Sequence, residues 1–311
     1  MNDHAQTNEK IGIALGSGAA RGWAHIGVLN ALSEMGIAPD IVAGSSVGAL
    51  VGAAYASEKL DVLEDWCRSL THKRMLGYLD LSLLGGGLIQ GEKLQTFVSD
   101  KIGDQEIDAL PRVFAAVATD LETGQEVWLQ EGSVRSGVQA SMAIPGLFAP
   151  VRRNDQWLVD GGLTNPVPVS LCRALGATTV IAVNLNSDIV GKHSRERSDR
   201  AAGAGAREKG VLGAGLEQLR LGLLGHKQRI LERLLGENSS APGVFEVMAG
   251  SINIMQDRIT RARMAGDPPE IAIAPQLAHL GLLEFDKAAQ AIEEGAACAN
   301  SMREKIEQAL G

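Results

Sequence analysis

The sequence predicts an α/β protein organised around a mainly parallel sheet. Four short apolar runs without charged side chains fit buried parallel strands, which are apolar on both faces: residues 11–15, 41–43, 113–118 and 178–184. Much of the chain between these runs carries apolar residues at helical spacing. The composition is 45% hydrophobic but only 4% aromatic, with 37 glycines. This composition suits closely packed helices and strands joined by tight turns rather than a β-sandwich.

The first strand, at residues 11–15, leads into a glycine-rich loop at residues 16–22. The helix that follows has an apolar residue at every third position, and Gly36 stands where a C-terminal cap belongs. A glycine-rich loop between a strand and a helix is an anion site, because free N–H groups converge there.

Two ligands compete for this loop. A dinucleotide-binding loop would read G-x-G-x-x-G, but Arg21 occupies the last position of that frame. A dinucleotide fold also needs an acidic residue at the end of its second strand, whereas Asp40 precedes that strand. Backbone donors that face a serine form an oxyanion hole, and we favour this interpretation.

The second strand runs into the sequence Gly44-Ser45-Ser46-Val47-Gly48, which is followed by a helix of small residues. This is the G-x-S-x-G pattern of a nucleophile elbow, with Ser46 rather than Ser45 at the apex. Glycine two positions to either side lets neighbouring backbone pass a strained turn without Cβ clashes. The alternative is an ordinary turn rich in glycine and serine.

The middle of the chain alternates between helices and strands. Residues 85–89 are glycine-rich and indicate a flexible connector, with part of a lid over the site as the lesser alternative. Residues 113–120 predict a buried strand, and residues 126–129 predict its hairpin partner. A helix over residues 134–142 is stopped by Pro145, and the apolar residues beyond it are candidates to line a substrate channel.

A short strand at residues 157–159 delivers Asp160 to a turn that continues with Gly161 and Gly162. Asp-Gly pairs are common in ordinary turns, which is the alternative interpretation. Here, however, the carboxylate directly follows a strand, and the two glycines let its turn approach the serine elbow closely.

The composition changes after the strand at residues 178–184. Residues 192–209 have almost no large apolar side chain and predict a mobile surface loop. Residues 212–235 predict a helix whose leucines pack on the domain or on a partner, with an interfacial membrane helix as the lesser alternative. The last elements are a helix, a strand and a closing helix, at residues 244–264, 270–274 and 286–310.

The net charge of −8 gives no general attraction to nucleic acid or to anionic lipid, so any membrane contact has to be local. Cys67, Cys172 and Cys298 form no C-x-x-C pair, which fits a reducing, cytoplasmic setting. The first ten residues show no secretory signal, and the uncharged run at residues 41–57 falls short of the ~20 residues that span a bilayer. The six histidines are scattered, and no metal-ligand cluster is visible.

The glycine-rich loop, the serine elbow and the Asp160-Gly161-Gly162 turn occur in this order, and together they resemble the patatin-like phospholipase family. The likeness is greatest to small bacterial members related to the neuropathy target esterase domain. It covers residues 11–171 as one domain, and residues 172–311 are then an α-rich extension that completes the fold, with the mobile loop at about residues 187–210. The resemblance implies a three-layer α/β/α sandwich with a mainly parallel central sheet.

The resemblance also implies a Ser–Asp dyad, with Ser46 as the nucleophile, Asp160 as the base and no catalytic histidine. Gly18 and Ala19 would supply the oxyanion N–H groups, and Arg21 would support that loop. Gly16 and Gly22 bound the loop, Gly44 and Gly48 form the elbow, and Gly161 and Gly162 form the turn. Family members often have three glycines in a row, which Ser17 and Ala19 interrupt here. A backbone donor survives a change from glycine to alanine when φ stays negative.

The activity implied is hydrolysis of lipid acyl esters through an acyl-serine intermediate, without a cofactor or metal. The implied partners are a lipid or acyl-ester substrate and, transiently, a membrane surface, but no nucleic acid. Homo-oligomer formation stays open. The implied location is the cytoplasm, with peripheral contact at the inner face of the membrane.

Two alternatives remain. An α/β-hydrolase with a full triad would need a histidine after Asp160, and His279 is a stronger candidate than His193 or His226. The other alternative is a lipid-binding regulatory protein whose serine site is vestigial.

Overall fold

The computed structural model of the chain describes residues 9–71, 87–89, 96, 98–188 and 244–310. The predicted mobile loop at residues 192–209 and the predicted helix at residues 212–235 lie outside the described residues, as do His193 and His226.

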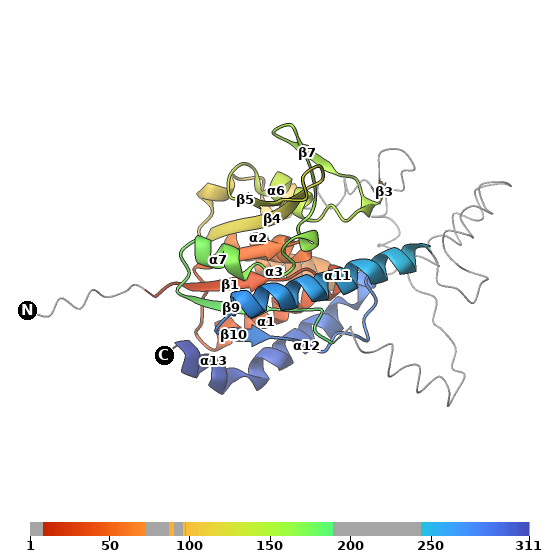
Figure 1. Cartoon of the computed structure of the whole chain (residues 1–311). Helices are drawn as coiled ribbons and strands as arrows, with labels where there is room; N and C mark the ends of the chain where they lie inside the picture. Colours follow the sequence, from red (N-terminus) through yellow and green to blue (C-terminus); the bar gives the residue numbers. More distant parts are fainter. Residues whose placement is uncertain (1–8, 72–86, 90–95, 97, 189–243, 311) are drawn as a thin grey trace, which may run out of the picture.

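The centre of the molecule is a mainly parallel sheet, as expected (Figure 1). Its parallel strands follow the order β10 (Ile271–Ile273), β9 (Thr179–Val183), β1 (Ile11–Leu15), β2 (Ile41–Ser45) and β4 (Val113–Asp120). Antiparallel strands extend it beyond β4: β5 (Glu126–Leu129), β8 (Gln156–Asp160) and β7 (Val151–Arg153). The predicted hairpin of β4 and β5 is therefore confirmed.

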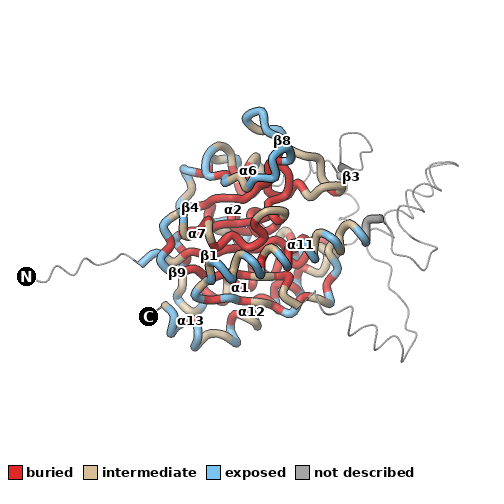
Figure 2. Tube along the Cα trace, in the orientation of Figure 1, coloured by how far each residue is buried: buried red, intermediate tan, exposed pale blue. Residues whose placement is uncertain are grey.

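Alternate side chains of the strands belong to two separate apolar clusters, one on each face of the sheet. In β1, for example, Ile13 and Leu15 contribute to one cluster and Ala14 to the other. The first cluster is shared with α1 (Ala24–Glu34), α2 (Val47–Ala56), α3 (Leu60–Arg68), α6 (Val134–Ser141) and α12 (Ala288–Ser301). The second is shared with α7 (Val169–Ala174) and with Met264 of α11 (Val244–Gly266). The sheet is thus the buried middle layer of a three-layer α/β/α sandwich, which confirms the expected fold class (Figure 2).

Beyond residue 172, the described strands and helices pack into the same core. Strands β9 and β10 join the sheet beside β1. Helix α12 packs very closely on α1. If Gly27 carried a Cβ atom, that atom would lie only 1.9 Å from the backbone oxygen of Ile292, and a Cβ atom added at Gly295 would lie 2.0 Å from the backbone oxygen of Ala24. Only glycine at these positions allows such an approach.

Two expectations about local structure are wrong. Within the stretch expected as a connector, β3 (Gly87–Ile89) is a strand that pairs in parallel with β6 (Gly146–Phe148). The single closing helix is divided at Met302 into α12 and α13 (Arg303–Leu310). The backbone N–H of Met302 bonds to the carbonyl of Ala299, three residues back, so the α-helical pattern is interrupted there.

Candidate active site

Ser46 lies in the turn between β2 and α2, with φ 57° and ψ −125°, a conformation that non-glycine residues rarely adopt. The turn is tight, because a Cβ at Gly48 would lie 2.1 Å from the backbone oxygen of Leu15. The Ser46 N–H donates to Ser141 Oγ at the end of α6 over 2.9 Å. Tertiary contacts therefore hold Ser46 in its strained backbone conformation.

Strand β4 brings Asp160 to Ser46. In β2, Ser45 pairs with Val117 of β4, and in β8, Asp160 pairs with the next residue, Ala118. Because β5 occupies the other edge of β4 over this stretch, β2 and β8 share one edge and meet end to end. The serine that follows β2 and the carboxylate that ends β8 are thereby placed side by side.

The two side chains are hydrogen-bonded. Ser46 Oγ donates to Asp160 Oδ2 over 2.5 Å, and the Gly162 N–H donates to Asp160 Oδ1 over 2.7 Å. Asp160 is only 1% exposed, and this burial raises the pKa of its carboxyl to about 7, although the two hydrogen bonds oppose the rise. A carboxylate with such a pKa can accept and return a proton near neutral pH.

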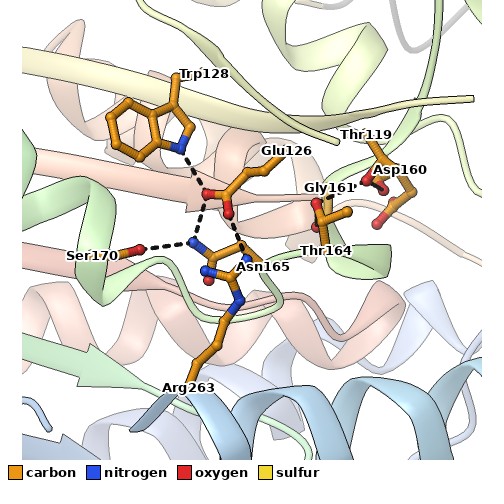
Figure 3. Close-up of polar contacts among 9 residues, drawn as sticks. All are labelled: Thr119, Glu126, Trp128, Asp160, Gly161, Thr164, Asn165, Ser170 and Arg263. Carbon is orange, nitrogen blue, oxygen red and sulfur yellow. Dashed lines mark hydrogen bonds and ion pairs between the residues drawn. The ribbon is translucent and has the colours of Figure 1, made fainter. Parts of the chain in front are cut away.

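The backbone of the Asp160 turn is fixed as well. Thr119 Oγ1 of β4 donates to the Asp160 carbonyl over 2.9 Å (Figure 3). A Cβ at Gly161 would lie 2.2 Å from the backbone oxygen of Val117, so the turn lies directly on β4. The turn also lies close to the serine elbow, as the hydrogen bond between Ser46 and Asp160 requires.

The glycine-rich loop presents free backbone donors. Within the described part of the chain, the N–H groups of Gly18 and Ala19 have no hydrogen-bond acceptor. The loop lies against the elbow, since a Cβ at Gly22 would be 2.2 Å from the Val47 side chain and one at Gly48 would be 2.8 Å from the Gly16 oxygen. Such unpaired N–H groups beside a serine can stabilise an oxyanion.

The condition of a negative φ is not met at Ala19, because its φ is 49°. A left-handed conformation costs a non-glycine residue about 1–3 kcal/mol, which the surrounding structure has to offset. A Cβ at the neighbouring Gly18 would lie 2.7 Å from Leu185 Cδ1, so the Leu185 side chain would have to shift to admit it. The N–H groups of Gly18 and Ala19 thus stay free, while the backbone of Ala19 is strained.

Two buried basic side chains hold this loop by its carbonyls. Arg21 Nε donates to the Gly18 oxygen over 3.2 Å, and burial lowers the pKa of Arg21 to about 10, so it stays charged at neutral pH. His25 Nε2 lies 2.7 Å from the Gly16 oxygen, and burial lowers the pKa of His25 to about 4. The neutral imidazole therefore carries its proton on Nε2 and donates it to the carbonyl.

No histidine bonds to Ser46 within the described part of the chain. His25 is committed to the Gly16 carbonyl, and His279 makes no hydrogen bond to Ser46 or Asp160. In the same ranges, no three histidine, cysteine or acidic side chains lie together so as to hold a metal ion. Among the described helices, none is long and apolar enough to cross a membrane.

All the predicted site residues in the three motifs are brought to one region: Gly16, Gly18, Ala19, Arg21, Gly22, Gly44, Ser46, Gly48, Asp160, Gly161 and Gly162. Sequence reasoning missed the role of Ser141, whose side-chain hydroxyl accepts a hydrogen bond from the Ser46 backbone N–H. It also missed contacts from α11, for which no motif gives a signal.

A serine elbow beside a buried carboxylate, at the end of a mainly parallel sheet, is an arrangement that suits nucleophilic catalysis by a serine. The family model described as Patatin-like phospholipase matches residues 13–173, and the chain belongs to this family. The resemblance inferred from the three motifs is therefore confirmed.

Two relatives of known sequence agree with this assignment. An uncharacterized NTE family protein of Mycobacterium tuberculosis is 33% identical over 335 residues, which cover 97% of this chain and 93% of that protein. Patatin-like phospholipase domain-containing protein 6 of Homo sapiens is 33% identical over 188 residues, which cover 58% of this chain and 14% of that protein. Among solved structures, VipD from Legionella pneumophila aligns with a TM-score of 0.43 and 12% identity, over 95% of this chain and 66% of that one.

Proposed function

We propose that the protein is a serine acyl hydrolase that cleaves lipid esters through a Ser46–Asp160 dyad. The observation that carries the proposal is the 2.5 Å hydrogen bond from Ser46 Oγ to Asp160 Oδ2, beside a loop with unpaired N–H groups at Gly18 and Ala19. Membership of the patatin-like phospholipase family supports a lipid ester as the substrate.

In the first half-reaction, Ser46 Oγ attacks the ester carbonyl carbon while its proton passes to Asp160 Oδ2. The N–H groups of Gly18 and Ala19 donate to the oxyanion that forms. The C–O bond to the leaving group then breaks, and the departing alcohol oxygen takes the proton from Asp160, which leaves an acyl-serine.

In the second half-reaction, Asp160 takes a proton from a water molecule, whose oxygen attacks the acyl carbon. The same loop donates to the second oxyanion. The bond to Ser46 Oγ breaks, the serine recovers its proton from Asp160, and the fatty acid leaves.

The three cysteines are free thiols, which supports a reducing compartment. We therefore place the activity in the cytoplasm, with peripheral contact at the inner membrane face, where lipid esters are available.

The test is turnover of p-nitrophenyl esters of increasing chain length, alone and in mixed micelles, by the full chain and by Ser46→Ala. We expect hydrolysis by the wild-type chain, loss of activity in the variant, and labelling of Ser46 by a fluorophosphonate. Failure of the wild-type chain to hydrolyse any ester would favour a lipid-binding role, and a label on Ser45 would exclude Ser46 as the nucleophile.

A further inference from the structure

Helix α11 (Val244–Gly266, labelled in Figure 1) lies outside the segment that matches the family model, yet its side chains contact residues around the candidate active site. It makes polar contacts with the oxyanion loop, with Asn186 in the turn that follows β9, and with β5. The α11 residues that make these contacts lie outside the three motifs.

The first contact reaches the oxyanion loop through Arg21. This guanidinium is 2% exposed and donates from Nε to the Gly18 carbonyl and from Nη2 to Asn253 Oδ1, each over 3.2 Å. A buried guanidinium that loses an acceptor pays the desolvation penalty of an unpaired donor. Asn253 therefore fixes the side chain that in turn fixes Gly18.

The second contact reaches the same loop through Asn186. Its Nδ2 lies 3.2 Å from both the Ser17 carbonyl and Gln256 Oε1. Gln256 is 6% exposed and also lies against the aspartate turn, because a Cβ at Gly162 would be 2.3 Å from Gln256 Nε2. The Gln256 side chain of α11 thus contacts both Asn186, which bonds to the oxyanion loop, and the turn that carries Asp160.

The C-terminal end of α11 is anchored beside that turn (Figure 3). Arg263 Nη2 donates to Glu126 Oε2 over 2.7 Å, and Glu126 Oε1 accepts from Asn165 Nδ2 over 2.7 Å and from Trp128 Nε1 over 2.6 Å. Asn165 itself donates its backbone N–H to the Gly161 carbonyl over 2.9 Å. The ion pair therefore holds α11 in a fixed position relative to the Asp160 turn.

We propose that Asn253 and Gln256 are positioning residues, which from α11 hold the oxyanion loop in place relative to Asp160 by way of Arg21 and Asn186. This inference rests on the proposed function. Neither residue needs to touch the substrate. The loop requires such support, because Ala19 is held at φ 49° and the free N–H groups must stay aligned with the oxyanion.

The first test compares Asn253→Leu, which removes the acceptor at similar volume, with Asn253→Asp, which keeps an acceptor. With p-nitrophenyl butyrate as the substrate, we expect kcat to fall about 10-fold in the leucine variant with KM unchanged, less than the ~10²–10³-fold loss that follows removal of a whole oxyanion donor. The aspartate variant should recover most of kcat. Ser251→Ala, on the exposed side of the same helix, is the matched control and should behave as wild type.

The second test asks whether Asn253 acts through Arg21. In the Arg21→Met background, Asn253→Leu should lower kcat no further, because the side chain that it holds is already gone. Independent, additive effects of the two changes would overturn the proposed route.

A third measurement does not depend on turnover. Amide hydrogen exchange of residues 16–22, followed by mass spectrometry, should be faster in Asn253→Leu than in wild type and unchanged in Ser251→Ala. Unchanged exchange in Asn253→Leu would overturn the positioning role even if the chain hydrolysed no ester. An active wild-type chain with an equally active leucine variant would overturn the role and leave the proposed function intact.

Discussion

Ser46 and Asp160 follow two strands that meet end to end along one edge of β4, and their side-chain oxygens lie 2.5 Å apart. Their separation is therefore set by neighbouring positions of a single buried strand, Val117 and Ala118. Strand β4 also pairs with β5 along its other edge, so β4 itself is held in place, and β2 and β8 cannot easily shift relative to each other.

Asp160→Asn should abolish turnover while the fold is kept. The amide has the shape of the carboxyl group but cannot take the Ser46 proton, so we expect a ~10²–10⁴-fold loss of kcat, the contribution typical of a general base. The rate of p-nitrophenyl butyrate hydrolysis and the circular dichroism spectrum measure the two parts of this prediction. A folded Asp160→Asn variant with near wild-type kcat would show that another group takes the proton.

The same substitution should stabilise the protein at alkaline pH. Burial raises the pKa of Asp160 to about 7, above the ordinary value near 3.8, so the folded state disfavours the ionised form. Between these two values the folded state binds more protons than the unfolded state, and its stability contribution falls as the pH rises. The Tm of Asp160→Asn should therefore exceed that of wild type at pH 8, by more than at pH 5. A difference that shrinks as the pH rises would contradict this.

The pH dependence of kcat/KM should rise through an apparent pKa near 7. The base must be ionised to accept the serine proton, and burial raises the pKa of the Asp160 carboxyl to about 7. Initial rates from pH 5 to pH 9 at constant ionic strength measure this rising limb of the profile of kcat/KM against pH. A limb centred near pH 4 would mean that Asp160 titrates as an ordinary carboxyl group or is not the base.

Ser141→Ala should lower kcat about 5- to 10-fold. It removes the acceptor of the Ser46 N–H, and a hydrogen bond of this kind contributes about 1 kcal/mol to holding the strained elbow. Ser45→Ala is the matched control, because Ser45 is equally buried and its hydroxyl has no partner within the described residues. Equal activity of the two variants would show that the Ser141 contact does not position the nucleophile.

The strands and the three motifs could be predicted because their signals are local. An apolar run followed by glycine and serine specifies a strand and a tight turn within a dozen residues, as in β2 and the Ser46 elbow. The backbone of Ala19 could not be predicted, since its positive φ is maintained by contacts from elsewhere in the fold. Arg21 and Asn253 meet across 232 positions of sequence, and nothing local to either residue indicates the other.

The last prediction separates the dyad from a triad. In a triad a histidine takes the serine proton and the acid only orients it, so loss of the histidine costs about 10³-fold or more. In the described structure, the Asp160 carboxylate instead accepts a hydrogen bond directly from Ser46 Oγ, while His25 donates to the Gly16 carbonyl. His279→Gln should therefore keep most of the kcat, and so should the same change at His193 or His226.

The measurement is kcat for p-nitrophenyl butyrate, with Asp160→Asn as the inactive reference and circular dichroism as the check on folding. His25 needs separate treatment, because its imidazole supports the oxyanion loop without touching the nucleophile. Its replacement by glutamine, which keeps an N–H donor, should retain more activity than replacement by leucine. If His279→Gln stayed folded and lost activity to the level of Asp160→Asn, the histidine would be the base and the dyad would be wrong.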